Sequence, residues 1–354
     1  MREAAATAHG SEGAGTVRTV LGDVAPGELG VCDAHDHLFL TSPQLPGQEL
    51  DSVTSAGAEL AAFRAAGGQS VIQWTPHGMG RRAAELPGLA RAAGVHVVAA
   101  TGLHQSVHYT PGLPAGLRAP EDARAVNGAD GADGADATNG AEVTDSADDA
   151  DSADATDRLA ALFVRELTRG IGGSGVRAGL IKVAGGFHGL DAHARWTMAA
   201  AAAAHRATGA PIAVHLELGT AALDVLDLLC GDAGVPPGKV ILGHLNRDPD
   251  PVVHAQAAAA GCWLAFDGPS RAQHATDWRM PEAVRALAEA GHGDRLLLGG
   301  DTTTAAARSV DGGPGMPHLL RRVRPRLARA VGTELVDRIL TVNPQRAFAV
   351  RWAR

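Results

Sequence analysis

Short apolar runs alternate along the chain with longer segments rich in Ala, Leu and Arg. Helical candidates include residues 56–66, 192–208 and 281–290. This alternation is typical of repeated β–α units around a parallel sheet. The apolar runs number eight: VCDAHDHL, SVIQWT, VHVVAATG, AGLIKVAGG, PIAVHLE, KVILGHL, CWLAFDG and RLLLGGD. Eight such units over this length predict an α/β fold, the (β/α)8 TIM barrel, whose catalytic groups lie at the carboxyl ends of the strands.

The pattern predicts one domain over residues 1–354, with the barrel itself at about residues 17–345. Residues 127–157 interrupt the pattern with ten acidic residues, no Lys or Arg and almost no large apolar side chains. Such a segment cannot offset the entropy of its own ordering. We therefore expect a disordered acidic insertion at about residues 121–157, a helix beginning near Arg158, and a C-terminal helix and tail over residues 333–354.

Composition excludes two classes of protein. Acidic and basic residues nearly balance outside the insertion, although the formal net charge is −8, and no basic run with interleaved aromatic residues is present. We therefore expect no nucleic-acid partner. The chain shows no run of 18 apolar residues and no apolar leader, which predicts no membrane association. Cys32, Cys230 and Cys262 lie far apart in apolar stretches, as buried thiols do in a reducing compartment, so we expect a cytoplasmic protein.

Two histidines stand one residue apart in the first apolar run. In an extended strand His35 and His37 point to the same face, which suits two ligands of one metal ion. Taken alone, the pair is equally compatible with core histidines that are bonded to backbone carbonyls.

Further polar residues occur at the ends of the later strands. Lys182 lies on the fourth run, His215 on the fifth, His244 on the sixth and Asp301 on the eighth. Each histidine alone is compatible with a core role. Six polar groups on one rim of an apolar barrel would have a large desolvation cost. Packing cannot offset this cost, whereas bound divalent cations can. The sequence therefore predicts a metal centre built from His35, His37, Lys182, His215, His244 and Asp301.

Lys182 is the exception in this set, because an ammonium group has no lone pair and repels a cation. If its amine reacts with carbon dioxide, it becomes a carbamate, an anionic group with two oxygens that can bridge two metal ions. The alternative is a buried lysine paired with Asp301.

These motifs resemble the phosphotriesterase family of the amidohydrolase superfamily, and in particular its lactonase-like branch. The match runs from VLGDVAPGELGVCDAHDHLFL through GVRAGLIKVAGG, APIAVHLELGT and KVILGHLNRDPDP to DRLLLGGDTTT, and the acidic insertion is foreign to it. The resemblance implies a binuclear-metal hydrolase in which His35, His37, Lys182 and Asp301 hold the more buried metal. Lys182, His215 and His244 would hold the other. It also implies a carboxylated Lys182 and is compatible with a homodimer.

The resemblance implies two divalent cations, with zinc favoured and manganese, cobalt or iron as alternatives. Two such cations lower the pKa of a bridging water from 15.7 toward 7, and the resulting hydroxide attacks a carbonyl or phosphoryl centre. Lys182 and Asp301 are the catalytic candidates, with Asp301 as proton shuttle.

The segments GHLNRDPDP, FDGPSR and GGPG resemble the branch that hydrolyses lactones, including sugar lactones, so we predict a lactonase acting on a small-molecule lactone or ester. The alternatives are a phosphotriesterase of the aryldialkylphosphatase type, another phosphoesterase, or a non-catalytic metal-binding homologue. The last is disfavoured because all six ligand positions are filled.

Two arginines are candidates for binding a substrate phosphate or carboxylate, because a guanidinium offers a planar fork of donors. These are Arg247 and Arg271, and the alternative for Arg247 is an ion pair with Asp248 or Asp250. The loop after Asp301 holds Arg308 as its one cation, fewer than we expect of a phosphofuranose lactonase. Side chains that follow the third strand are expected to be exposed in a loop, with lining of the pocket mouth as the alternative: His104, His108 and Tyr109.

Overall fold

In a computed structural model of the chain, which describes residues 15–109, 112–113, 117, 146–267 and 276–353, all eight apolar runs form strands. The third run is broken at Ala99 into two short strands. Neighbouring strands pair in parallel wherever a register is formed. The barrel strands are β3 (Cys32–Asp36), β4 (Ser70–Gln73), β5 (His96–Val98), β6 (Ala100–Gly102), β7 (Leu180–Ala184), β8 (Ile212–His215), β9 (Val240–Gly243), β10 (Trp263–Asp267) and β11 (Leu296–Gly299). The predicted TIM barrel is confirmed.

The ring of strands closes where β11 meets β3. One ladder runs β3-β4-β5 and the other runs from β6 to β11. At the closure, the Asp301 N–H donates to the carbonyl of His35 at 2.9 Å and the Gly300 N–H donates to the carboxylate of Asp33 at 3.0 Å. A Cβ at Gly300 would overlap the carboxylate of Asp36, so glycine is required there. Closure therefore brings polar residues of the first and last strands together.

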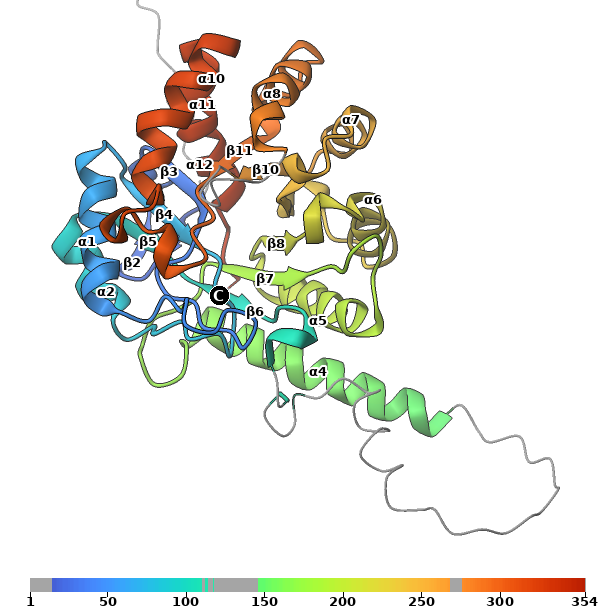
Figure 1. Cartoon of the computed structure of the whole chain (residues 1–354). Coiled ribbons are helices and arrows are strands. Elements are labelled where there is room, and N and C mark those ends of the chain that lie inside the picture. Colours follow the sequence, from blue (N-terminus) through green and yellow to red (C-terminus); the bar gives the residue numbers. More distant parts are fainter. Residues whose placement is uncertain (1–14, 110–111, 114–116, 118–145, 268–275, 354) are drawn as a thin grey trace, which may run out of the picture.

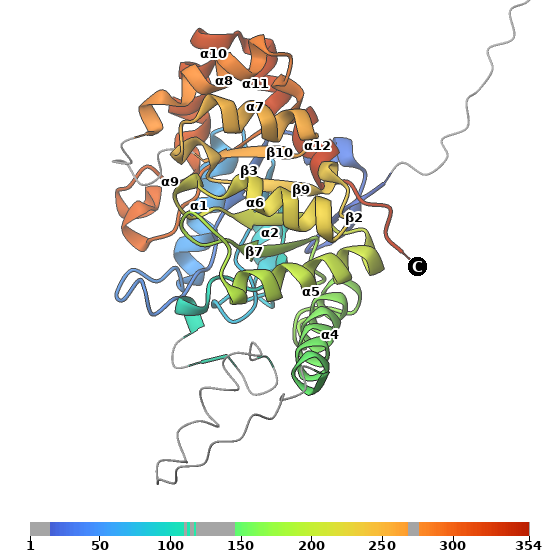
Figure 2. The ribbon, with the colours of Figure 1, turned by 90° about the vertical axis from the view of Figure 1, so that its right-hand side faces the viewer.

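Helices cover the outside of the strands (Figures 1 and 2). The helix expected over residues 192–208 has those bounds, with Asp191 accepting from the Ala194 N–H at its start and Gly209 in the left-handed region at its end. This helix is α5 (Ala192–Thr208). The remaining helices are α1 (Val53–Ala65), α2 (Leu86–Ala93), α4 (Ser146–Thr168), α6 (Ala222–Leu226), α7 (Pro251–Ala260), α8 (Met280–Glu289), α9 (Gly315–His318), α10 (Arg324–Val331), α11 (Thr333–Leu340) and α12 (Val342–Phe348). A hairpin of β1 (Val17–Thr19) and β2 (Gly22–Val24) precedes the barrel.

The core has two layers. One cluster of buried apolar side chains fills the inside of the barrel, and the larger one packs between strands and helices. Trp74 is fully buried in the inner cluster, where its indole N–H donates to the carbonyl of Ala34 at 2.9 Å. Cys32 and Cys262 are buried free thiols, as expected, whereas Cys230 is partly exposed. Within the described residues, no helix combines the length and apolar character needed to cross a membrane.

Helix α4 begins at Ser146, twelve residues before the predicted start at Arg158, so residues 146–157 of the expected disordered insertion are helical. Alanine has the highest intrinsic helix propensity, and acidic residues in the first turns interact favourably with the helix dipole. Arg158 also pairs with Asp154 one turn earlier. The rest of that prediction, residues 121–145, lies outside the described residues, and the assignment of a single domain stays a prediction.

Glu166 connects helix α4 to the barrel through hydrogen bonds. Its buried carboxylate accepts two hydrogen bonds from Arg81, at 2.7 and 2.8 Å, and one from the hydroxyl of Thr101 at 2.6 Å. His77 Nδ1 lies 3.3 Å away. Burial alone would raise the pKa of Glu166, but the hydrogen bonds from Arg81 and His77 outweigh it and lower the pKa to about 2.

We expect Glu166→Gln to lower the free energy of unfolding by about 3 kcal/mol at pH 7. Because the folded pKa of Glu166 lies below its unfolded value, its contribution is present above about pH 4.5 and is lost as the pH falls toward 2. The difference from the parent protein should therefore shrink below pH 4.5. Urea unfolding of metal-free protein at pH 7, 5 and 3.5, followed by circular dichroism, measures it.

The matched control is Glu85→Gln, since this exposed carboxylate faces Arg82 at 3.5 Å on the surface. It should change the free energy of unfolding by less than about 0.5 kcal/mol. A difference between the Glu166 variant and the parent that is independent of pH would contradict the role given to the charge.

Candidate metal centre

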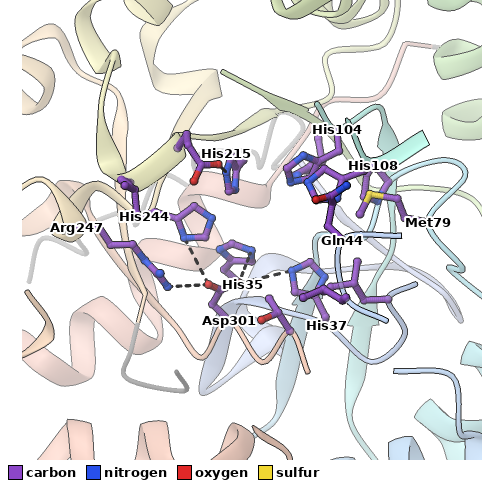
Figure 3. Close-up of a pocket in the computed structure, with 17 residues that line it drawn as sticks. His35, His37, Gln44, Met79, His104, His108, His215, His244, Arg247 and Asp301 are labelled. Carbon is purple, nitrogen blue, oxygen red and sulfur yellow. Dashed lines mark hydrogen bonds and ion pairs between the residues drawn. The ribbon is translucent and has the colours of Figure 1, made fainter. Parts of the chain in front are cut away.

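The six predicted residues meet at the carboxyl ends of the strands, around a cavity of about 230 Å³ (Figure 3). His35 lies in β3 and His37 follows it, Lys182 is the middle residue of β7, and His215 ends β8. His244 follows β9 directly and Asp301 follows β11. All six line the cavity, and all but the half-buried His215 are buried: His35, His37, Lys182, His215, His244 and Asp301.

Asp301 lies between the histidines. Its Oδ1 is 3.6 Å from His35 Nε2 and 3.7 Å from His37 Nε2, and its Oδ2 is 3.6 Å from His244 Nδ1. These separations are too long for hydrogen bonds. Two ligand atoms at tetrahedral positions about 2.1 Å from one zinc ion would lie about 3.4 Å apart. The spacing of His35, His37 and Asp301 therefore fits a cation held among them.

Two of these residues have unusual backbones. His244 has φ 62° and Asp301 has φ 51°, both in the left-handed region, where residues other than glycine are uncommon. Such a conformation costs about 1–3 kcal/mol and persists where the surroundings enforce it, often at functional sites. At Asp301 the surroundings include the bond from its N–H to His35 that closes the barrel.

Asp267, the last residue of β10, orients two of the histidines at once. Its Oδ1 lies 2.9 Å from His35 Nδ1, and its Oδ2 lies 2.5 Å from His244 Nδ1 and accepts from the His244 N–H at 2.7 Å. His35, His244 and Asp267 are close enough to share a metal ion. His35 Nδ1 forms a hydrogen bond with Asp267, whereas His244 Nδ1 makes an ion-pair contact without hydrogen-bond geometry. Asp267 therefore orients the rings and leaves both Nε2 atoms for a ligand.

The other two histidines are also held by oxygen atoms. His37 Nδ1 lies 2.8 Å from the hydroxyl of Thr75, and His215 Nε2 lies 3.0 Å from Glu217 Oε2. A histidine that binds a metal through one ring nitrogen usually donates its other N–H to an oxygen. The pattern therefore makes Nε2 of His37 and Nδ1 of His215 the nitrogens available to a metal, and the whole donor set fits divalent cations.

Sequence reasoning missed Asp267, although its signal was the same as for the others. It is an acidic residue at the end of an apolar run, in CWLAFDG. It is fully buried, and burial would raise its pKa, but the charges of His35 and His244 hold the pKa of Asp267 well below its usual range.

Lys182 is buried in the same cavity. Burial lowers the pKa of its amine to about 7, against the attraction of Asp301 and Glu217. A substantial fraction of the amine is therefore uncharged near neutral pH, and the uncharged amine is the form that reacts with carbon dioxide.

Of the two arginine candidates for substrate binding, Arg247 is described by the structure and Arg271 is not. Arg247 is buried, lines the cavity and donates to Asp301 Oδ2 at 2.9 Å, rather than pairing with Asp248 or Asp250 as the alternative supposed. Arg271 lies outside the described residues. Arg308 is buried away from the cavity and donates to the carbonyl of Leu38.

The expectation that the side chains after the third strand are exposed is wrong for His104 and Tyr109, and the alternative that they line the pocket is confirmed for His104 and His108. His104 is 8% exposed and lines the cavity together with His108, while Tyr109 is 7% exposed. Tyr109 is held by its hydroxyl, which donates to the carbonyl of His77 at 3.0 Å.

The indole of Trp74 stacks on His35 with ring centroids 3.8 Å apart, so its packing also orients this ring.

A TIM barrel with buried histidines and an aspartate at the carboxyl ends of its strands defines a class of metal-binding barrel proteins. A model of the phosphotriesterase family matches residues 15–144 and 142–348. The chain therefore belongs to the phosphotriesterase family, as its motifs predicted. The family's binuclear metal chemistry agrees with the described side chains that could hold an ion, among them His35, His37 and Asp301.

Two curated relatives span nearly the whole chain. It is 26% identical to a phospho-furanose lactonase of Mycoplasmopsis synoviae over 357 residues, 94% of this chain and 91% of that protein. It is also 26% identical to the N-acetyltaurine hydrolase of Homo sapiens over 376 residues, 94% of this chain and 97% of that protein. The solved structure of a lactonase from Listeria monocytogenes superposes with a TM-score of 0.77 at 24% identity, covering 95% of this chain and 99% of that one.

We expect Asp267→Asn to weaken the binding of zinc about tenfold to a hundredfold. An amide has one acceptor oxygen where Asp267 has two, so His35 or His244 would face an NH2 group instead of an acceptor. Competition with a chromophoric chelator measures this affinity without an activity assay.

Glu217→Gln is the matched control. It removes a carboxylate beside His215 but keeps one acceptor for the single histidine that Glu217 contacts. Its zinc affinity should stay within about threefold of the parent. Equal affinities in all three proteins would show that Asp267 does not orient metal ligands.

Proposed function

We propose that the protein is a binuclear metal-dependent hydrolase that acts on lactones. The observation that carries the proposal is the set of four predicted histidine ligands, each of which has one ring nitrogen within 3.0 Å of a side-chain oxygen. The relative named phospho-furanose lactonase supports the choice of substrate class. The partner would be a small-molecule lactone or ester. A homodimer and a cytoplasmic location stay predictions.

In this proposal His35, His37, Lys182 and Asp301 hold the more buried metal ion, and Lys182, His215 and His244 hold the other. Lys182 would act as a carbamate after reaction with carbon dioxide, which its burial and the lowered pKa of its amine support. Zinc is the favoured metal. Manganese, cobalt and iron are alternatives, because histidine, carboxylate and carbamate sites also accept them. When bound, the two cations lower the pKa of water and polarise the carbonyl oxygen of the substrate.

The residues of the chain supply orientation and proton transfer. Asp301 lies between the histidines, and the charges of His244, His35 and Arg247 hold its pKa below the usual range despite burial. It is therefore ionised at neutral pH and able to accept the proton of the attacking water, then pass it to the leaving oxygen. Arg247, 2.9 Å from Asp301 Oδ2, fixes the orientation of this carboxylate. A role of Arg247 or Arg271 as a substrate ligand stays a prediction.

Hydrolysis of an N-acyl amide is the second candidate function. The relative named N-acetyltaurine hydrolase has the same identity and similar coverage as the lactonase relative. Attack on the carbonyl carbon is common to an ester and an amide, but the leaving nitrogen of an amide must be protonated. Activity on a phosphotriester is the third, and the three are separated by one substrate panel.

Purified protein should contain about two metal ions per chain and hydrolyse members of a lactone panel faster than N-acetyltaurine or paraoxon. Lys182→Ala should lose metal and turnover together, because it removes the group shared by both metal ions. Elemental analysis and a pH-stat assay measure the two. Carbon-13 bicarbonate should give one carbamate NMR signal that is absent from Lys182→Ala.

Lys239→Ala is the matched control, since the chain has two lysines and the second donates to the carbonyl of Ala349 away from the cavity. It should keep metal, turnover and the NMR signal. One metal ion or none, with no turnover of any ester, amide or phosphotriester, would overturn the proposed function.

A further inference from the structure

His104 has all of its polar groups but one engaged by hydrogen bonds. Its backbone N–H donates to the hydroxyl of Tyr109 at 2.7 Å, and its carbonyl accepts from His193 Nε2 at 2.9 Å. Its Nδ1 accepts from the backbone N–H of Gln105 at 2.8 Å. The residue is thus fixed in position on both sides of its Cα and at one ring nitrogen.

These contacts also fix the tautomer of the ring. A backbone N–H is always a donor, so Nδ1 of His104 must carry a lone pair rather than a proton. The ring is therefore neutral, with its proton on Nε2. Within the described residues no hydrogen bond from this Nε2–H is found. His104 presents a fixed, uncharged donor that lacks an acceptor in the folded chain.

That donor belongs to the wall of the cavity. The His104 ring lies 4.6 Å from the ring of His215 and 4.2 Å from that of His108, measured between centroids. In Figure 3, His104 and His108 lie on the side of the labelled group away from Arg247. His104 is 8% exposed and lines the cavity, and its Nε2 stays accessible there. An acceptor atom on a bound substrate would take the place of solvent at this donor.

Glu217 adds an acceptor to the same wall. Gln105 links the two residues, because its backbone N–H donates to His104 and its side-chain amide donates to Glu217 Oε2 at 3.1 Å. Glu217 lines the cavity and is partly exposed there. A neutral N–H donor and a carboxylate on one wall suit a substrate with hydroxyl groups, which both accept and donate. The same carboxylate repels a phosphate.

We propose that His104 is a substrate-recognition residue that donates its Nε2–H to a hydroxyl oxygen of the lactone and that, with Glu217, it selects uncharged hydroxylated lactones. This inference rests on the proposed lactonase function and names the substrate class of the same cavity. It places recognition on the wall opposite Arg247.

The test compares two lactones with the same ring, arabinono-1,4-lactone with hydroxyl groups and γ-butyrolactone without them. His104→Phe keeps an aromatic ring and removes the donor, so kcat/KM for arabinono-1,4-lactone should fall about tenfold to a hundredfold. The value for γ-butyrolactone should change less than about threefold. His104→Gln, whose amide nitrogen can replace Nε2–H, should recover most of the loss. His96→Phe, a substitution of the same kind in β5 outside the cavity lining, controls for folding.

Metal content and melting temperature are measured on every variant, which separates recognition from a structural role. If His104→Phe lowers activity on both lactones equally, or loses metal, His104 has a structural role and the inference is wrong while the lactonase function stands. Faster turnover of arabinono-1,4-lactone 5-phosphate than of the unphosphorylated lactone by the parent protein would also overturn it. If the parent hydrolyses no lactone at all, the proposed function fails and the inference fails with it.

Discussion

The carboxyl end of the barrel depends on one constraint, which is that buried polar and charged groups need compensating partners. Asp267 and Asp301 are buried and ionised, and Asp36 is buried beside them. Arg247 compensates Asp301 through one direct contact, whereas burial lowers the pKa of the Lys182 amine to about 7 and so reduces its charge near neutral pH. The described basic residues therefore compensate the buried carboxylates only in part, and the ring nitrogens of the histidines face the same cavity. Divalent cations are the partners that would satisfy both sets of groups, and the rest of the site is arranged around that requirement.

The closure of the barrel determines how closely the groups can approach. β3 contains His35 and leads to His37, and β11 leads to Asp301; these strands are first and last in the ring. The bond from the Asp301 N–H to the carbonyl of His35 joins them where no full ladder forms. Gly300 allows this contact, because any side chain there would collide with Asp36. This glycine is thus part of the packing that closes the barrel.

The sequence predicted the eight strands and the six cavity residues because one rule covers both: apolar runs form the strands, and function lies where they end. It missed contacts that depend on distant segments. Arg247 pairs with Asp301, 54 positions away, rather than with its acidic neighbours. His104 is buried, and its carbonyl accepts a hydrogen bond from His193, 89 positions later. The early start of α4 was missed because an acidic, alanine-rich segment has the composition of a disordered one, and the two differ in local helix propensity alone.

Hydrogen bonds link the proposed substrate-recognition residues to a histidine of the proposed metal centre. Glu217 contacts His215 Nε2 with the same oxygen that accepts from Gln105, and Gln105 also fixes the tautomer of His104. A hydroxyl group that binds between His104 and Glu217 would therefore act on the side chain that orients one histidine of the metal centre. Recognition of the correct lactone and orientation of His215 are then parts of one hydrogen-bond network, and networks of this kind are worth more than the sum of their separate bonds. Since the network lies on the wall away from Arg247, the proposed proton acceptor Asp301 and the proposed recognition residues would be positioned by separate contacts.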